Sequence, residues 1–238
     1  MIDVHSHILP GMDDGSKSIE ESISILKRMA EQNVETVIAT SHFYADREML
    51  EHYLARRERA YQKLTAAMEE AAVRLPEVIL GAEVWYFDGI SHSDSLRPLC
   101  TAGTDILLLE MPFSKWTERM IGEILSLKEE SGFTVLLAHV ERYLRWQKKE
   151  IWERLSEQEI LMQTNAEAFL ERKTARKVFK MLKLGQVQLI GSDCHNLSSR
   201  PPNYSEAIEK IRKKLGEEAI GYLTRMEKLL YRSAEGAH

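Results

Sequence analysis

Short runs of apolar residues alternate with longer stretches of helical periodicity along the 238-residue chain. The short runs are mostly continuous rather than alternating with polar residues, which is typical of parallel strands buried on both faces. Seven of them predict strands, at residues 2–7, 34–40, 78–84, 106–110, 134–139, 160–165 and 187–193. The stretches between and after them predict helices, at residues 19–30, 48–75, 116–130, 150–158, 174–184, 204–215 and 218–231. This order predicts an α/β fold in which helices cover a parallel sheet.

A sheet of seven parallel strands has two common arrangements. At this chain length, closure into a (β/α) barrel is the leading expectation, and an open, doubly wound sheet is the alternative. The sequence contains no internal repeat, low-complexity segment or Gly/Ser-rich linker, so we expect a single domain over residues 1–238.

Composition narrows the classes of function. The 32 Lys and Arg residues against 37 Asp and Glu residues give a formal net charge of −5, which argues against non-specific nucleic-acid binding. The two cysteines, Cys100 and Cys194, are too few for a disulfide framework and favour a reducing compartment, so we expect a cytoplasmic location. The first residues lack the basic and apolar segments of a signal peptide, and we expect no membrane span.

Potential metal ligands lie at the ends of almost all the predicted strands. The carboxyl ends of parallel barrel strands converge on one mouth, so residues as far apart as His5 and His195 would share one pocket. Imidazole and carboxylate groups are the ligands that suit Zn, Mn or Fe. The residues concerned are His5, His7, His42, Glu83, Glu110, His139, Asp193 and His195.

For some of these candidates, the position in a predicted strand or turn also supports metal binding. His5 and His7 lie two apart on a strand, so both rings point to one face, where two buried imidazoles need partners. Glu110 ends an apolar strand, where a carboxylate is costly to bury unless it is paired or binds a metal. Asp13 and Asp14 lie in a predicted turn, from which one of them can reach the same pocket.

Two arginines follow candidate ligands at the predicted mouth. Arg142 comes three residues after His139, and Arg200 comes shortly after His195. Arginines beside a multi-metal site suit a phosphate group, which a guanidinium binds in bidentate fashion. The remaining histidines are interpreted as surface residues: His52, His92 and His238.

Cys194 and Arg200 also match the C-x5-R pattern of cysteine-dependent tyrosine phosphatases. The five residues between them include no glycine, and Pro201 and Pro202 follow at once, so few backbone amides remain to wrap a phosphate. The pattern also leaves the metal-ligand candidates unexplained, and a packed thiol beside them is the simpler interpretation.

Taken together, the ordered motifs resemble those of the polymerase-and-histidinol-phosphatase (PHP) superfamily. More narrowly, the chain is similar to the bacterial manganese-dependent protein tyrosine phosphatases encoded with capsule and exopolysaccharide genes. The motifs that carry the resemblance are Asp3-Val4-His5-Ser6-His7, Asp13-Asp14-Gly15, Thr40-Ser41-His42, Gly81-Ala82-Glu83, His139-Val140-Glu141-Arg142-Tyr143, Ser192-Asp193-Cys194-His195-Asn196 and Arg200-Pro201-Pro202. The stretch from Leu230 to His238 does not resemble the family's final segment, which leaves C-terminal packing and oligomeric state open.

The resemblance implies a distorted seven-stranded (β/α) TIM-like barrel with three divalent metals at the carboxyl ends of its strands. Mn²⁺ is the metal that it implies first, with Fe, Zn, Mg or Co as alternatives. It implies a first metal held by His5, His7, Glu83 and Asp193, a second by Glu83, Glu110 and His139, and a third by Asp14, His42 and His195.

The resemblance also implies an activity. Phosphotyrosine would be hydrolysed by a hydroxide that bridges two metals, with Arg142 and Arg200 neutralising the phosphoryl oxygens and His42 or His195 assisting. The implied substrate is the tyrosine-rich tail of a bacterial tyrosine kinase that controls polysaccharide export. Alternatives are a small-molecule phosphatase such as histidinol phosphatase, a nuclease, a cysteine-dependent phosphatase, and a non-catalytic module that docks through the helix at residues 19–30.

Overall fold

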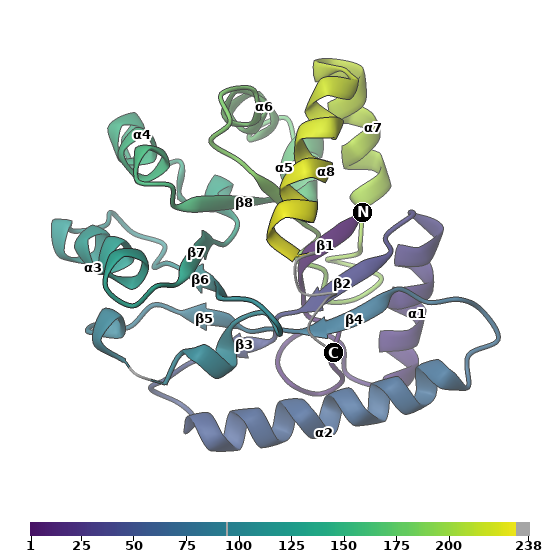
Figure 1. The fold of residues 1–238 in the computed structure, drawn as a ribbon. Helices are drawn as coiled ribbons and strands as arrows, with labels where there is room; N and C mark the ends of the chain where they lie inside the picture. The colour runs from purple at the N-terminus through teal and green to yellow at the C-terminus, as the bar shows by residue number, and fades with distance from the viewer. Residues whose placement is uncertain (94, 232–238) are drawn as a thin grey trace.

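The structure is a computed structural model that describes residues 1–93 and 95–231. Parallel strands curl around a common centre, and helices cover the outside of the curl (Figure 1). The α/β class, the parallel pairing and the helical cover expected from the sequence are confirmed. Residues 232–238, which belong to the C-terminal stretch that departs from the family, lie outside the described residues, and the expectation for His238 is therefore not tested.

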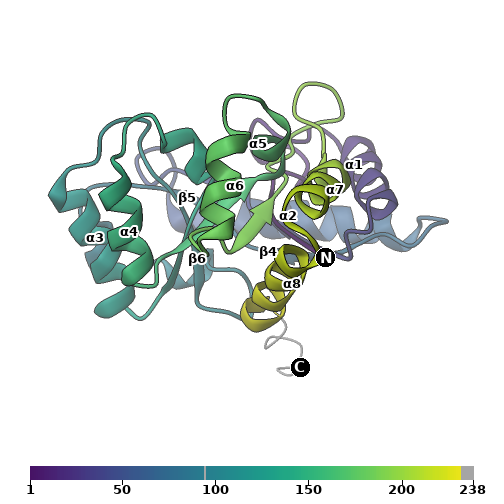
Figure 2. The same cartoon turned by 90° about the horizontal axis from the view of Figure 1, so that it is seen from above.

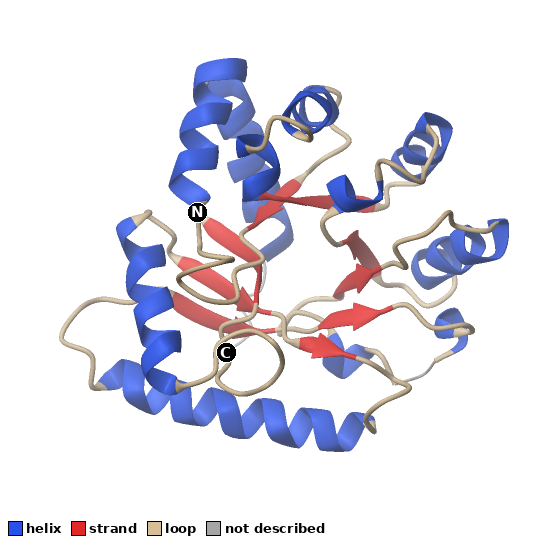
Figure 3. Cartoon of the chain, turned by 180° about the vertical axis from the view of Figure 1, so that it is seen from behind, coloured by secondary structure: helices blue, strands red, loops and turns tan. Residues whose placement is uncertain are grey.

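The strands form two hydrogen-bonded sheets in which every pairing is parallel. The first sheet has the order β1-β2-β4, and the second has the order β3-β5-β6-β7-β8-β9. A parallel bridge between Ser6 and Cys194 joins β1 to the segment after β9, so the strands trace an almost complete ring (Figure 3). The strands are β1 (Ile2–Ser6), β2 (Thr36–Ala39), β3 (His42–Phe43), β4 (Glu77–Leu80), β5 (Glu83–Trp85), β6 (Ile106–Glu110), β7 (Thr134–Leu137), β8 (Leu161–Asn165) and β9 (Leu189–Gly191).

The expected sheet of seven continuous strands is not what the hydrogen bonds form, because two of the strands are interrupted. Residues 40–41 separate β2 from β3, and residues 81–82 separate β4 from β5. At the first break, Thr40 Oγ1 accepts a hydrogen bond from the Ser6 amide and donates one to the Ser6 carbonyl, so a side chain takes part in the pairing. At the second, a Cβ on Gly81 would lie 3.1 Å from the nearest side-chain atom of β2. At these two breaks the chain passes from the first sheet, which contains β2 and β4, to the second, which contains β3 and β5.

The helices follow one another around the ring, and α3, α4, α6 and α7 appear in that order in the view from above (Figure 2). They are α1 (Ile19–Glu31), α2 (Leu50–Glu69), α3 (Glu118–Glu129), α4 (Lys149–Glu157), α5 (Ala166–Leu170), α6 (Ala175–Lys183), α7 (Tyr204–Leu215) and α8 (Glu217–Tyr231). Short 3-10 helices lie at η1 (Ile90–His92), η2 (Arg97–Leu99) and η3 (Val140–Tyr143). No helix in the described ranges is long and apolar enough to cross a membrane.

Helix α1 begins where its sequence predicts. The Ser18 side chain accepts a hydrogen bond from the Glu21 amide, which satisfies one of the free N–H groups of the first turn. The face formed by Ile25, Leu26 and Met29 is buried in the main hydrophobic core. This face is therefore not an open docking surface, which removes the basis for the non-catalytic docking alternative.

Two helical predictions differ from the structure. The helix expected at residues 48–75 ends at Glu69, and its last turn has no basic residue to offset the unfavourable charge of Glu69 and Glu70 at the negative end of the helix dipole. Helix α5 is absent from the prediction. It is only five residues long and starts directly after β8, so it has too few residues to display a helical period.

Strand β6 illustrates how the sheet positions polar groups. Leu107 and Leu109 belong to the large core beneath the helices, whereas Ile106 and Leu108 belong to a second, smaller apolar cluster that also includes Tyr231 of α8. Because side chains alternate along a strand, Glu110 shares the face of that second cluster at the carboxyl end of β6. The smaller cluster thus lies beneath the polar mouth.

Candidate metal centre

The nine ligand candidates from the sequence lie together at the carboxyl ends of the strands. All of them except His42 and Asp14 are buried. They are His5 in β1, His7 after it, Asp14 in the loop before α1, His42 in β3, Glu83 in β5, Glu110 in β6, His139 after β7, and Asp193 and His195 after β9. The convergence predicted from the strand ends is present in the structure.

The first pair of histidines shares two carboxylates. The Nε2 atoms of His5 and His7 lie 3.2 Å apart, and each lies 3.2 Å from Glu83 Oε2. Asp193 Oδ1 lies 3.7 Å from His5 Nε2 and 3.4 Å from His7 Nε2. His5, His7 and Asp193 form one group of donors that could hold a cation.

Glu83 and Glu110 face a second pair of imidazoles. His139 Nε2 lies 2.8 Å from Glu83 Oε1 and 3.3 Å from Glu110 Oε1. On the other side, His42 Nδ1 lies 3.0 Å from Glu83 Oε2 and 3.7 Å from Glu110 Oε2. Glu83 is thus shared between two parts of the cluster, as a bridging carboxylate would be.

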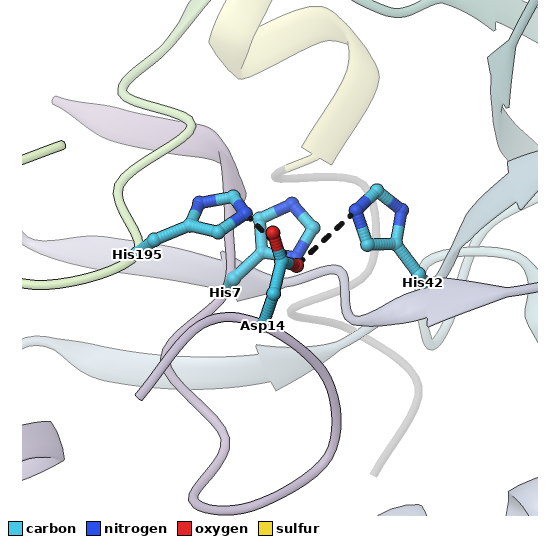
Figure 4. A group of neighbouring side chains, drawn as sticks. All are labelled: His7, Asp14, His42 and His195. Atoms are coloured by element: carbon cyan, nitrogen blue, oxygen red, sulfur yellow. Dashed lines mark ion pairs between the residues drawn. The ribbon is translucent and has the colours of Figure 1, made fainter. Parts of the chain in front are cut away.

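Asp14 approaches the cluster from the open side, between His42 and His195 (Figure 4). Its Oδ1 lies 3.3 Å from His195 Nε2 and 3.6 Å from His42 Nε2. The neighbouring Asp13 points the other way, into the protein, where it accepts a hydrogen bond from His7 Nδ1. With side-chain exposures of 65% for Asp14 and 7% for Asp13, the geometry favours Asp14 as the ligand candidate and Asp13 as its support.

The donor groups do not follow the partition that the resemblance implies. His7 joins Asp14, His42 and His195 in one group, in addition to its group with His5. The carboxylates Glu83 and Glu110 are grouped with His42, and His139 belongs to none of the three groups found in the described ranges. The set of residues is the expected one, but His7 and His42 each lie between two potential cation positions.

Backbone features hold the ligand candidates in place. A Cβ at Gly15 would lie 2.2 Å from the His7 carbonyl oxygen, and one at Gly191 would lie 2.5 Å from the His5 Cβ, so each position needs glycine. His139 and Asp193 adopt φ values of 31° and 52°, in the left-handed region that non-glycine residues rarely occupy. Such backbone strain is concentrated at functional sites in proteins.

Buried polar atoms without hydrogen-bond partners support a fit to metal ions. Among the residues that the structure describes, His42 Nδ1, Glu83 Oε2, Glu110 Oε2 and His139 Nδ1 have no such partner. A buried carboxylate oxygen or imidazole nitrogen without a hydrogen bond is costly, and three of these atoms contact one another only at ion-pair distances across the cluster. Divalent cations would satisfy them.

The pKa values of the histidines are shifted by burial and by the charged groups that lie close to them in the cluster. Burial alone lowers the pKa of His139, but its hydrogen bonds to Glu110 and Glu83 raise the pKa to about 9. Burial, followed by the nearby charge of His7, lowers the pKa of His195 to about 4. Protons on some of the imidazoles therefore balance the carboxylates, and bound cations would replace those protons.

A second layer of side chains orients the first, and its main member, Gln163, was not predicted from the sequence. Gln163 Oε1 accepts from the His139 amide at 2.6 Å and lies 3.2 Å from His5 Nδ1. Asn165, two residues further along β8, donates to Asp193 Oδ2 at 2.8 Å. Gln163 and Asn165 are two residues apart in a buried strand, so both side chains point to the same face. This pair of polar residues is the sequence pattern from which the second layer could have been predicted.

Arg142 and Arg200 reach the cluster from opposite sides of Asp193. Arg142 Nη2 donates to Asp193 Oδ2 at 2.5 Å, and Arg200 Nη2 lies 2.7 Å from Asp193 Oδ1. Arg200 Nη1 also lies 2.7 Å from His195 Nε2. Both guanidinium groups are therefore at the mouth, as the sequence predicts.

Cys194 is unsuited to nucleophilic catalysis. Its side chain is completely buried, and burial raises the pKa of its thiol to about 12. Arg200, the other half of the C-x5-R pattern, is directed to Asp193 and His195. The structure therefore argues against the cysteine-dependent alternative.

Two cavities flank the cluster. The first, the α2 cavity, has a volume of about 820 Å³ and is lined by Asp14, His42, Tyr44, Arg47 and His52, among others. His52 is exposed, as expected, yet it borders this cavity, which its sequence context did not indicate. The second, the η3 cleft, has a volume of about 660 Å³, and its lining includes Phe113, Arg142, Arg145, Trp146, Lys173 and Lys177.

An aromatic rim, made of Tyr44, Trp85, Phe113 and Trp146, connects the two cavities. Ring centroids are 6.0 Å apart for Tyr44 and Trp85, and 6.1 Å apart for both following pairs. The rim touches the cluster where Tyr44 lies 5.2 Å from the His42 ring and where Phe113 lies 6.0 Å from the His139 ring. Aromatic side chains thus border the mouth from one cavity to the other.

Known proteins resemble this chain in fold and in sequence. A cluster of histidines and carboxylates at the strand ends of such a curled parallel sheet defines the chain as an α/β protein with a candidate metal centre at the mouth of its sheet. The family model described as "Capsular polysaccharide synthesis, CpsB/CapC" matches residues 1–231. The chain belongs to the CpsB/CapC family.

Several relatives in this family carry a functional name. The tyrosine-protein phosphatase CpsB of Streptococcus pneumoniae is 33% identical, over 91% of each chain. That of Streptococcus agalactiae serotype V is 30% identical, over 94% of each chain. The tyrosine-protein phosphatase YwqE of Bacillus subtilis is 27% identical, over 98% of this chain and 92% of YwqE.

Solved structures agree on the fold. One from a study of YwqE from Bacillus subtilis and CpsB from Streptococcus pneumoniae, described as metal-dependent tyrosine phosphatases, superimposes with a TM-score of 0.86, at 23% identity, over 98% of this chain and 94% of the other. The histidinol phosphate phosphatase of Lactococcus lactis, solved with zinc, L-histidinol and phosphate, gives a TM-score of 0.56, at 16% identity, over 92% and 93%.

Proposed function

We propose that this protein is a metal-dependent protein tyrosine phosphatase, and thus a phosphoric monoester hydrolase. The observation that carries the proposal is the cluster of imidazole and carboxylate donors at the strand ends of a CpsB/CapC-family chain. The relatives compared above are named tyrosine-protein phosphatases, and we infer the same substrate class here.

We propose three divalent metal ions as resident cofactors, with Mn²⁺ as the metal and Fe, Zn, Mg or Co as alternatives. The three donor groups support this number of ions, and the buried atoms of His42, Glu83, Glu110 and His139 that lack a hydrogen bond support this type of ligand. When bound, such metals polarise phosphoryl oxygens and lower the pKa of a coordinated water. The proposed ligands are His5, His7, Asp14, His42, Glu83, Glu110, His139, Asp193 and His195.

The protein's own cations would bind the phosphoryl group. Arg142 and Arg200 have side-chain exposures of 35% and 33%, so each can contact Asp193 and still present N–H groups to a substrate. Their charges neutralise the equatorial oxygens as negative charge spreads in the transition state. A phenolate leaving group, with a pKa of about 10, needs less protonation than an alkoxide. His42 or His195, which lie beside Asp14 on the open side of the cluster, would assist departure of the phenolate.

The aromatic rim favours an aryl phosphate among the substrates that the superfamily accepts. A phosphotyrosine ring whose phosphate lies between Arg142 and Arg200 can stack against Tyr44, Trp85 or Phe113. Histidinol phosphate offers a smaller, more polar group to the same surface.

We also propose a substrate, a location and a domain organisation for this protein, on the basis of its family. The substrate would be the tyrosine-rich tail of a bacterial tyrosine kinase, the location would be cytoplasmic, and residues 1–238 would act as one catalytic domain. The interrupted strands β2/β3 and β4/β5 would together fill two of the seven positions of a PHP barrel.

Hydrolysis of three substrates by the purified, manganese-loaded protein tests this proposal. A phosphotyrosyl peptide should be turned over faster than histidinol phosphate or single-stranded DNA. A preference for histidinol phosphate would indicate the small-molecule phosphatase, and a preference for DNA would indicate a nuclease.

A further inference from the structure

The η3 cleft opens beside the proposed phosphate site. Arg142, which binds Asp193, also lines the cleft, and so does Phe113, which stacks on His139. Phe113 is 41% exposed, an unusual state for a large apolar side chain next to a polar cluster. The cleft is therefore continuous with the catalytic mouth and has an aromatic wall.

Positive charge dominates the outer part of the cleft. The Arg145 guanidinium lies 3.8 Å from the centroid of the Trp146 ring. Lys173 and Lys177 are exposed, and neither side-chain ammonium group forms a hydrogen bond or an ion pair with any described residue. Lys177 also borders an adjoining cavity of about 270 Å³, where Lys180 lies further along α6. The cationic surface thus continues away from the mouth.

The two carboxylates of the cleft offset only part of the charge of its four cationic side chains. Glu141 is buried, and its Oε2 accepts from the Thr164 hydroxyl at 2.8 Å and from the Asn165 amide at 3.2 Å. Glu171 accepts a long hydrogen bond of 3.4 Å from the Thr174 hydroxyl. Helix α6 itself contains four basic residues and no acidic one.

The α2 cavity, on the other side of the cluster, differs in charge. Its lining has three carboxylates, those of Asp13, Asp14 and Glu48, against two arginines, one of which, Arg56, is paired with Glu48. The η3 cleft, with four cationic side chains against two carboxylates, therefore attracts an acidic group more strongly than the α2 cavity does.

We propose that the η3 cleft binds an acidic segment of the substrate polypeptide next to the phosphotyrosine, through Arg145, Lys173 and Lys177. This inference rests on the proposed phosphatase function and deepens it. Charge complementarity selects an Asp- or Glu-containing segment. A concave cleft that meets the catalytic mouth suits an extended chain already held at its phosphotyrosine, rather than a flat bilayer.

The test compares two phosphotyrosyl peptides that differ only in acidic or neutral residues beside the phosphotyrosine. Each value of kcat/KM is divided by the same variant's turnover of p-nitrophenyl phosphate, so that damage to the metal centre cancels. In the native protein the acidic peptide should be preferred by about 5- to 30-fold at low salt, the range for a few exposed ion pairs. The preference should fade as salt shortens the screening length.

Charge-reversal variants test whether Lys173 and Lys177 cause the preference for the acidic peptide. The double variant Lys173→Glu/Lys177→Glu should lose or invert the preference, whereas Lys173→Arg/Lys177→Arg should keep it. A matched double reversal on exposed lysines of α1 and α2, Lys27→Glu/Lys63→Glu, changes the net charge equally and should keep the preference.

An unchanged preference in the Lys173/Lys177 reversal would overturn the proposal, as would an equal loss in the Lys27/Lys63 reversal. The proposal would also be overturned if the Lys173→Glu/Lys177→Glu variant kept the peptide preference but lost binding to anionic vesicles or to single-stranded RNA. That result would assign the cleft to another partner. Failure of the native protein to hydrolyse p-nitrophenyl phosphate would count against the phosphatase function instead. Peptide affinity, measured by fluorescence anisotropy, would still test the cleft in that case.

Discussion

The Nδ1 atom of His7 lies 2.8 Å from Oδ2 of Asp13. The same carboxylate oxygen accepts a hydrogen bond from the backbone amide of His42 at 2.9 Å, and Oδ1 accepts one from the Gly15 amide at 2.9 Å. Asp13 therefore fixes the ring of one ligand candidate and the backbone of another, while its neighbour Asp14 faces the His195 ring. Burial opposes the ionised form of Asp13, but His7 and these hydrogen bonds hold its pKa well below the usual range.

Replacing Asp13 by Asn should weaken metal binding by about 10- to 100-fold, the usual cost of losing an orienting carboxylate. An amide nitrogen cannot accept the hydrogen bonds that Oδ2 receives from His7 and His42. Chelator competition with Mn²⁺ measures the affinity, and thermal unfolding checks that the variant folds. Unchanged affinity would show that Asp13 does not orient the ligands.

His5→Ala and Cys194→Ala should have opposite consequences for activity. His5 lies within 3.2 Å of His7 and Glu83, so its loss should reduce aryl phosphate turnover by at least about 10²-fold. Cys194 is buried with a thiol whose pKa is raised to about 12, so its loss should leave turnover nearly intact. An inactive Cys194→Ala variant beside an active His5→Ala variant would restore the cysteine mechanism.

Arg142→Lys and Arg200→Lys should each lower kcat/KM by about 10²-fold, because lysine keeps the charge but loses the planar fork that binds a phosphoryl group. Arg28→Lys, on the exposed side of α1 and paired with Glu31, is the matched control and should have no effect. Steady-state kinetics with an aryl phosphate distinguish the variants. Full activity in both arginine variants would contradict the phosphate-binding role.

Asp3→Asn should stabilise the metal-free protein at neutral pH. Asp3 is completely buried, its Oδ1 accepts from the Ser192 amide at 2.7 Å, and burial raises its pKa from 3.8 to about 6. The folded state thus retains a proton that the unfolded state releases, so this group's contribution to the free energy of unfolding is lost as pH rises from about 4 to 6. The loss amounts to up to about 3 kcal/mol.

Urea unfolding at a series of pH values compares Asp3→Asn with the native protein. Their difference in stability should grow between pH 4 and 6 and stay constant above it. The exposed Asp46→Asn variant is the control and should follow the native protein. A constant difference across the whole range would mean that Asp3 titrates normally.

Features that depend on one element alone were predictable from the sequence. Residues 106–110 form β6 and residues 204–215 form α7 with the expected bounds, because each pattern is complete within its own segment. The ligand candidates were predictable for a related reason, since a carboxylate or imidazole that ends a buried apolar strand requires a partner.

Features that depend on neighbouring elements were not predictable. The breaks at residues 40–41 and 81–82 arise from contacts between strands, as with Thr40 and Ser6. Gln163 supports His5 and His139 only because β8 lies beside both β7 and β9. The sharing of His7 between two donor groups depends on how the loop containing Asp14 folds over it.

The most direct test of the central claim is aryl phosphate hydrolysis by the protein after exhaustive chelation and after addition of Mn²⁺, with the metal content measured in parallel. The chelated protein should be inactive, and activity should return as about three metal ions bind to each chain, the number of donor groups in the cluster. Full activity in protein shown to be free of metal would contradict the account.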